Sequence, residues 1–224
     1  MDLIIATSPI KQTDHIDKAI ESVVHIPFNK RFILFDGLPE NADEDVVHRY
    51  NQYKLRLVND YPDYIHIYGN EHRWFVGGIN DVINNYSDAE WIFTIQHDVV
   101  LTDDLCTTSL LANKPDDAKI LCFPHIKLYE GFKHHWYNKV INTDKDWYKT
   151  HGWSERVFMF NRSYMTSLLK QYPSRKFIDT IFYNQSKSKY CAKSEENMES
   201  LWNIWRCYTH KDILHKHLVG KTDG

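Results

Sequence analysis

Residues 91–101 read Trp-Ile-Phe-Thr-Ile-Gln-His-Asp-Val-Val-Leu. The run from Trp91 to Ile95 is apolar or β-branched and too short for a helix, which predicts a strand buried on both faces. Asp98 follows this strand, and a second apolar stretch follows Asp98. A carboxylate directly after a strand lies at the carboxyl-terminal edge of the sheet. There it can serve as the hard oxygen ligand that a divalent cation bound to a diphosphate requires. The simpler alternative is that Asp98 caps the next turn.

Similar short apolar runs precede this strand, and each ends in polar or turn residues. They cover residues 3–7, 31–35 and 64–68, and they end at Ser8-Pro9, Asp36-Gly37 and Gly69-Asn70. Apolar residues at helical spacing lie between them, over residues 13–24, 44–59 and 77–86. The βαβαβαβ order with short connections predicts an α/β fold, a Rossmann-like and mostly parallel sheet flanked by helices. Ligands of such sheets bind at the carboxyl ends of the strands.

The second half of the chain is less regular. Strands are expected at 120–123 and 157–160, helices at 163–172 and from 195 to about 208, and an aromatic-rich excursion over 130–146. The sequence shows no internal repeat and no clear linker, which predicts one domain over residues 1–224.

Charge and hydropathy exclude several partners. The 27 basic and 30 acidic residues give a net charge of −3, so no basic excess drives binding to nucleic acid. The mean hydropathy is −0.54, and no apolar run approaches the roughly 20 residues of a transmembrane helix. Asp2 stands where a signal peptide carries positive charge, and the four cysteines form no Cys-x-x-Cys pair. We therefore expect a cytoplasmic protein without a transmembrane segment; peripheral membrane contact through a bound acceptor is an open alternative.

Residues 70–81, upstream of the strand that ends at Asp98, read Asn-Glu-His-Arg-Trp-Phe-Val-Gly-Gly-Ile-Asn-Asp. With the helix and strand that follow, this stretch resembles the GT-A glycosyltransferases, in particular glycosyltransferase family 2. Members of that family carry a pattern like N-x-G-x-x-x-A-x-N, then a helix, then a strand that ends in D-x-D. The residues that match the first part are Asn70, Gly77, Gly78 and Asn80. Gln96-His97-Asp98 stands in place of D-x-D, so only the second acid is retained.

The resemblance implies a nucleotide-sugar donor, UDP- or GDP-hexose, on residues 1–101 and a hydroxyl acceptor, such as a glycan, on residues 102–224. It places the end of the first strand and Asp36 at the base and ribose. The implied donor-binding residues are Thr7, Ser8, Pro9, Asp36, Arg73, Gly77, Gly78, Asn80, Gln96, His97 and Lys221. The implied metal ligands are Asp98 and the late histidines His215 and His217, for Mn²⁺ or Mg²⁺ acting as a Lewis acid. Solvent-exposed histidines and a turn at Asp36-Gly37 are the simpler alternatives.

An acidic pair opens the helix expected from residue 195. Ser194-Glu195-Glu196 resembles the acidic pair of family 2, with Glu196 in the position of the usual Asp. The chemistry needs one carboxylate to take the proton of the acceptor hydroxyl. Glu196 is the first candidate for this general base, Glu195 the second and Asp179 the third. The alternative is that these glutamates only complement the helix dipole.

The resemblance thus implies an inverting, metal-assisted glycosyltransferase. A non-catalytic module that binds nucleotide sugars or glycans on the same scaffold is the competing hypothesis, and the missing first acid at Gln96 supports it. A nucleotidyltransferase would need a glycine-rich loop after the first strand, which residues 7–11 lack.

Overall fold

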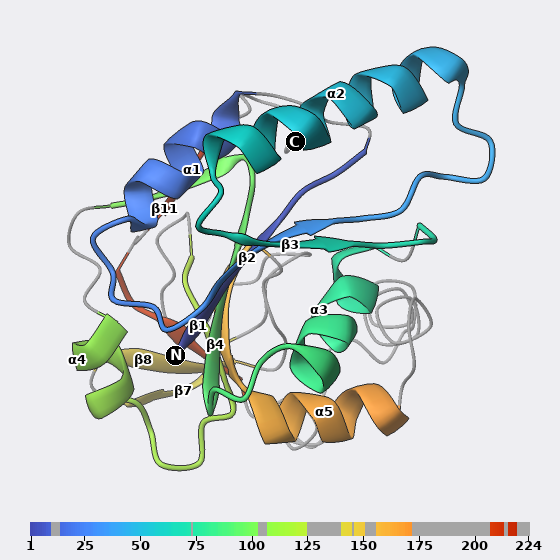
Figure 1. Ribbon diagram of the computed structural model, residues 1–224. Coiled ribbons are helices and arrows are strands. Elements are labelled where there is room, and N and C mark those ends of the chain that lie inside the picture. Colours follow the sequence, from blue (N-terminus) through green and yellow to red (C-terminus); the bar gives the residue numbers. More distant parts are fainter. Residues whose placement is uncertain are drawn as a thin grey trace.

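The first four strands form one parallel half-sheet, and they lie along the chain at the apolar runs that predict them. The computed structural model describes residues 1–9, 14–72, 74–102, 107–124, 140–144, 146–150, 156–171, 207–212 and 215–218 (Figure 1). The strands are β1 (Asp2–Ala6), β2 (Arg31–Phe35), β3 (Ile65–Tyr68) and β4 (Trp91–Gln96). They pair in parallel in the order β3-β2-β1-β4. Their carboxyl ends therefore meet at one edge of the sheet.

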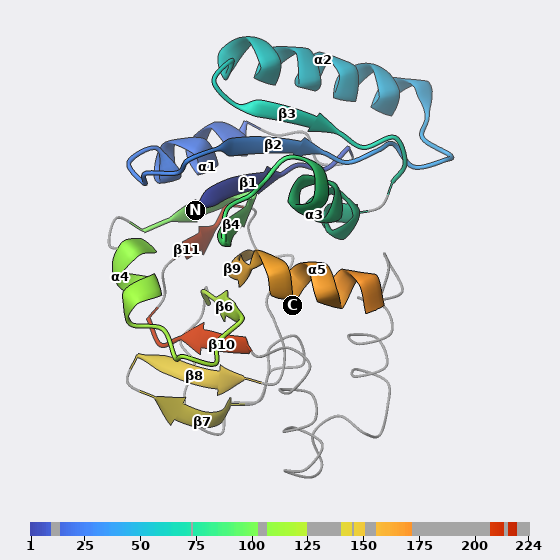
Figure 2. The same ribbon diagram turned by 60° about the horizontal axis from the view of Figure 1, so that its bottom comes forward.

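The same sheet continues through strands from the second half of the chain. These strands are β9 (Val157–Asn161), β6 (Ile120–Cys122), β10 (Cys207–His210), β8 (Trp147–Thr150) and β7 (Val140–Asp144), in that spatial order. Figure 2 shows the succession from β3 to β7. Among these nine strands β9 and β8 run opposite to the others, because each pairs antiparallel with both neighbours. The expected mostly parallel α/β sheet is confirmed.

Helices cover both faces of the sheet. The helices are α1 (His15–Val23), α2 (Glu44–Asp60), α3 (Trp74–Asn85), α4 (Thr107–Ala112) and α5 (Arg162–Gln171). Leu3 and Ile5 of β1 belong to the cluster that α1 and α2 cover, and Ile4 belongs to the cluster under α3 and α5 (Figure 1). This split follows from the alternation of side chains along a strand. Burial on both faces explains why β1, β2 and β4 read as unbroken apolar runs.

Helix α2 begins where its sequence predicts. The side chain of Asp43 accepts a hydrogen bond from the backbone N–H of Val46 at 2.7 Å, which caps the first turn. Glu44 and Asp45 follow in that turn and complement the helix dipole. The capped helix lays Tyr50, Tyr53 and Leu57 on the sheet.

Two expectations for the second half are wrong. The excursion over 130–146 contains strand β7, which pairs with β8 as an antiparallel hairpin. The helix expected from 195 to about 208 does not include Cys207 and Tyr208, because both lie in β10, buried between β6 and β8. Residues 195–206 lie outside the described part of the chain.

A small second sheet lies beside α1. It pairs β5 (Val99–Leu101) with β11 (His215–His217) in antiparallel register. Neither strand was predicted as such, although the apolar stretch behind Asp98 was noted. Among the described helices, none is long and apolar enough to cross a membrane.

Candidate functional site

Backbone hydrogen bonds tie the ends of β1 to β4 together. The amide of Thr7 donates to Leu34 at 2.9 Å, which joins β1 to β2. The amide of Gly69 donates to Phe35 at 2.7 Å, which joins β3 to β2. The amide of His97 donates to the carbonyl of Ala6 at 3.0 Å, which joins β4 to β1. Polar residues that follow four separate strands therefore lie along one edge of the sheet, where α/β folds bind ligands.

The side chains of Asp36 and His72 are in hydrogen-bonding contact at this edge. Oδ2 of Asp36 lies 2.7 Å from Nδ1 of His72, and Oδ1 accepts a hydrogen bond from the backbone N–H of Gly37 at 2.9 Å. Nδ1 of His72 also lies 3.2 Å from the carbonyl oxygen of Gly37. The side chain of His72 is 19% exposed and that of Asp36 is 9% exposed. His72 was not predicted as a site residue, although it stands inside the quoted stretch 70–81.

Glycines let the loops that carry these two residues approach closely. A Cβ on Gly37 would overlap the backbone of Glu71, and a Cβ on Gly69 would lie 2.9 Å from the amide nitrogen of Gly37. The loop after β2 thus packs on the loop after β3, backbone against backbone, as only glycine permits. This contact holds His72 beside Asp36.

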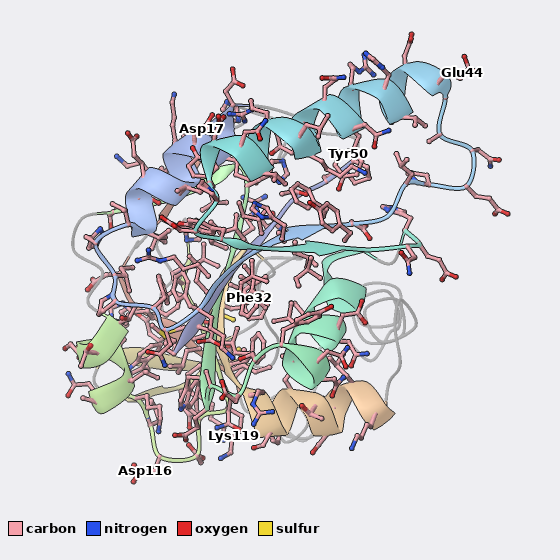
Figure 3. All side chains as sticks on the ribbon, in the orientation of Figure 1. Asp17, Phe32, Glu44, Tyr50, Asp116 and Lys119 are labelled. Carbon is pink, nitrogen blue, oxygen red and sulfur yellow. The ribbon has the colours of Figure 1, made fainter. Side chains whose placement is uncertain are left out.

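Tyr50 of α2 supports the same cluster from the helical layer. Its hydroxyl donates to the carbonyl oxygen of Asp36 at 2.8 Å and lies 3.5 Å from Oγ1 of Thr7. Thr7 in turn donates from Oγ1 to the carbonyl oxygen of Leu34 at 3.0 Å. Burial raises the pKa of Tyr50 above its ordinary value, so the phenol stays a donor. Figure 3 shows Tyr50 between α2 and the sheet. Tyr50 was not predicted as part of the site, because its helical spacing reads as core.

The residues of α3 that match the family 2 pattern are engaged in contacts within the protein. Gly78 is buried, and a Cβ at this position would overlap the side chain of Leu34 on β2. Asn80 is half-buried, and its Oδ1 accepts a hydrogen bond from Nδ2 of Asn84 at 2.9 Å. Gly77 is buried in the first half of the same helix, and Asn70 is exposed before it. Contacts of these residues with a donor stay a prediction.

The two residues that follow β4 are buried. His97 is 6% exposed and Asp98 is 3% exposed, whereas Gln96 is half-buried. Nδ1 of His97 lies 3.3 Å from the carbonyl oxygen of Ala6, and the backbone N–H of Gln96 donates to Arg156 at 3.1 Å. A buried carboxylate needs a partner of opposite charge or several donors, so the burial of Asp98 marks this position as special.

Strand β11 brings the two late histidines to the segment that follows Asp98. His215 pairs with Leu101 and His217 pairs with Val99, and the amide of Leu218 donates to the carbonyl of Asp98 at 2.8 Å. His215 is fully buried. The side chain of His217 lies outside the description. Within the residues that the structure describes, no group of three His, Cys, Asp or Glu side chains is arranged to hold a metal ion.

Several predicted site residues cannot be placed. Glu195, Glu196, Asp179, Arg73 and Lys221 all lie outside the described residues. Of the predicted residues that are described, the structure brings Thr7, Ser8, Pro9 and Asp36 to one edge with Gln96, His97 and Asp98, and it places the backbone of β11 beside Asp98.

Comparison with known proteins identifies the fold. No protein-family model matches the chain, and no curated protein sequence matches it. The glycosyltransferase GlyE of Streptococcus pneumoniae has a similar structure, with a TM-score of 0.51 and 11% identity over 98% of this chain and 54% of that one. This chain thus spans about half the length of GlyE.

Two further solved structures match this chain with lower TM-scores than GlyE. The galactosyltransferase LgtC, in complex with donor and acceptor sugar analogues, has a TM-score of 0.47 and 11% identity, over 99% of this chain and 88% of that one. HddC of Yersinia pseudotuberculosis has a TM-score of 0.45 and 12% identity, over 74% of this chain and 79% of that one. The likeness to GlyE, together with the sheet described above, shows that the chain has a GT-A-like glycosyltransferase fold.

Proposed function

We propose that the protein is a glycosyltransferase that moves a hexose from a nucleotide-sugar donor to an acceptor hydroxyl. One observation carries the proposal. Thr7, Asp36 and His72 converge with the buried Asp98 at the carboxyl ends of neighbouring parallel strands. This edge is where sheets of this class bind nucleotides, and the GT-A-like fold of the chain agrees with that use. Membership of glycosyltransferase family 2 stays a prediction from the motifs.

The donor nucleotide would lie along this edge. The turn Thr7-Ser8-Pro9 and Asp36 would meet the base and ribose, and Gln96, His97 and Asp98 would face the diphosphate and the sugar. Arg73, Gly77, Gly78, Asn80 and Lys221 complete the proposed donor site. The amide of Gly37 and the imidazole of His72 contact the carboxylate of Asp36, and Tyr50 contacts its carbonyl oxygen. These contacts support the proposed role of Asp36, because a preorganised group loses less entropy when a ligand binds.

Asp98 would anchor the diphosphate end through a divalent cation, Mn²⁺ or Mg²⁺, with His215 or His217 as further ligands. Carboxylate oxygens and imidazole nitrogens are suitable ligands for Mn²⁺. The pairing of β11 with β5 brings the backbone of both histidines to the segment that follows Asp98. The bound cation would supply charge neutralisation to the departing diphosphate. Among the described residues, no three such side chains are grouped to hold a metal ion.

A carboxylate from the second half would activate the acceptor. We propose Glu196 for this role, with Glu195 and then Asp179 as alternatives. As the acceptor oxygen attacks the anomeric carbon, its proton passes to the carboxylate, and the bond from that carbon to the diphosphate breaks. Attack opposite the leaving group inverts the configuration. The site then releases a nucleoside diphosphate and the glycosylated acceptor.

A non-catalytic module that binds nucleotide sugars or glycans is the second candidate. Gln96 favours it, because this neutral side chain stands where related transferases carry an acid and offsets no cation charge. Incubation with radiolabelled UDP- and GDP-hexoses, with and without Mn²⁺, separates the two candidates. An enzyme releases nucleoside diphosphate with Mn²⁺ and transfers or hydrolyses the sugar. Saturable binding without release supports the module, and absence of both binding and release contradicts the transferase and a module that binds these nucleotide sugars.

A further inference from the structure

No further inference is drawn: the strongest candidate, the buried thiol pair of Cys122 on β6 and Cys207 on β10, whose sulfur atoms lie 3.4 Å apart, supports no redox switch because the two cysteines stand two register positions apart on neighbouring parallel strands, a spacing that a disulfide bridges only if the backbone moves.

Discussion

The amide of Leu218 donates a hydrogen bond to the carbonyl of Asp98 at 2.8 Å. This bond continues the register of β11 on β5, so a segment more than a hundred residues later in the chain lies against the turn that carries Asp98. Sequence distance gives no hint of this contact. The pairing brings the backbone of the segment that contains the two late histidines beside Asp98, so single substitutions there can test the proposed metal site.

Asp98→Asn should weaken metal-dependent nucleotide binding and leave the fold intact. The amide keeps the shape of the carboxylate but removes the charge that a divalent cation requires. We expect UDP or GDP titrated with Mn²⁺ to bind at least tenfold more weakly, and titrations without Mn²⁺ to change little. Asp63→Asn, in an exposed turn, serves as the control. Equal affinity of parent and Asp98→Asn with Mn²⁺ would remove Asp98 from the site.

Alanine substitutions at two adjacent residues of β11 test whether a late histidine binds the proposed metal ion. His217 and Lys216 are adjacent in β11, and successive residues of a strand alternate between its two faces. We expect His217→Ala to reduce the gain in nucleotide affinity that Mn²⁺ gives, and Lys216→Ala to leave it unchanged. A gain that survives His217→Ala but is lost in His215→Ala would assign the ligand to His215. A gain that survives both would mean that neither histidine binds the metal.

Most of the first half could be predicted from sequence, because its elements are determined locally. β2 has the predicted bounds, residues 31–35, since every residue in it is apolar and buried except Arg31. The start of α2 is determined by the cap at Asp43. The parallel pairing of the four strands follows from their short helical connections, whereas their spatial order, β3-β2-β1-β4, was not predicted.

The strands of the second half and the site roles of His72 and Tyr50 could not be predicted, because they depend on contacts between residues far apart in the sequence. Cys207-Tyr208-Thr209-His210 becomes a strand only through its neighbours β6 and β8, and its own pattern continues the helical spacing before it. His72 acquires its role only when the loop after β3 meets the loop after β2. Tyr50 looks like an ordinary core residue until its hydroxyl is seen on Asp36.

Gly78→Ala should destabilise the protein, against the usual trend in helices. Alanine in place of a helical glycine normally stabilises by about 1 kcal/mol. At Gly78 the added Cβ would overlap the side chain of Leu34, which is 2% exposed and enclosed by the core. Overpacking of this kind costs roughly 1–3 kcal/mol. Urea unfolding should therefore show a net loss of stability.

The double variant checks the cause of this loss. Leu34→Ala removes the side chain that the new Cβ would overlap. In the Leu34→Ala background, Gly78→Ala should be neutral or stabilising, which gives a favourable coupling between the two sites. A gain in stability from Gly78→Ala alone would show that α3 does not pack on β2 through this glycine.

His210 should make the folded state sensitive to mild acid. Burial lowers the pKa of its imidazole below the ordinary 6.5, and the carboxylates of Asp212 and Asp146 offset only part of this effect. The unfolded chain therefore binds a proton at a higher pH than the native chain does. Stability should be unaffected above about pH 6.5 and should fall as the pH drops from there toward the lowered native pKa.

A non-titrating variant isolates this contribution. Nδ1 of His210 accepts a hydrogen bond from the amide of Asp212 at 3.1 Å, and the oxygen of His210→Asn can take over that contact. The free energy of unfolding, measured from pH 8 to pH 5, should fall less steeply in His210→Asn than in the parent. Identical slopes would show that His210 titrates alike in both states.

Glu196→Gln should abolish transfer while donor affinity stays near that of the parent. Loss of a positioned base costs roughly 10²–10⁴-fold in rate, and the proposed contact is with the acceptor rather than the nucleotide. Glu195→Gln is the matched control, because the two carboxylates are adjacent in sequence. Loss of transfer in Glu195→Gln alone would assign the base to Glu195. Full activity in both variants would leave Asp179 as the next candidate.

A thermal-shift comparison of UDP, GDP and CMP sugars, with and without Mn²⁺, tests the central claim most directly. A ligand that binds only the native state at a hundred times its Kd stabilises by about 2.7 kcal/mol, which corresponds to roughly 5–10 °C for a chain of this size. The proposed donor site predicts such a rise with a UDP or GDP sugar, dependent on Mn²⁺ and lost in Asp98→Asn. An unchanged melting temperature with every nucleotide sugar at millimolar concentration would contradict it.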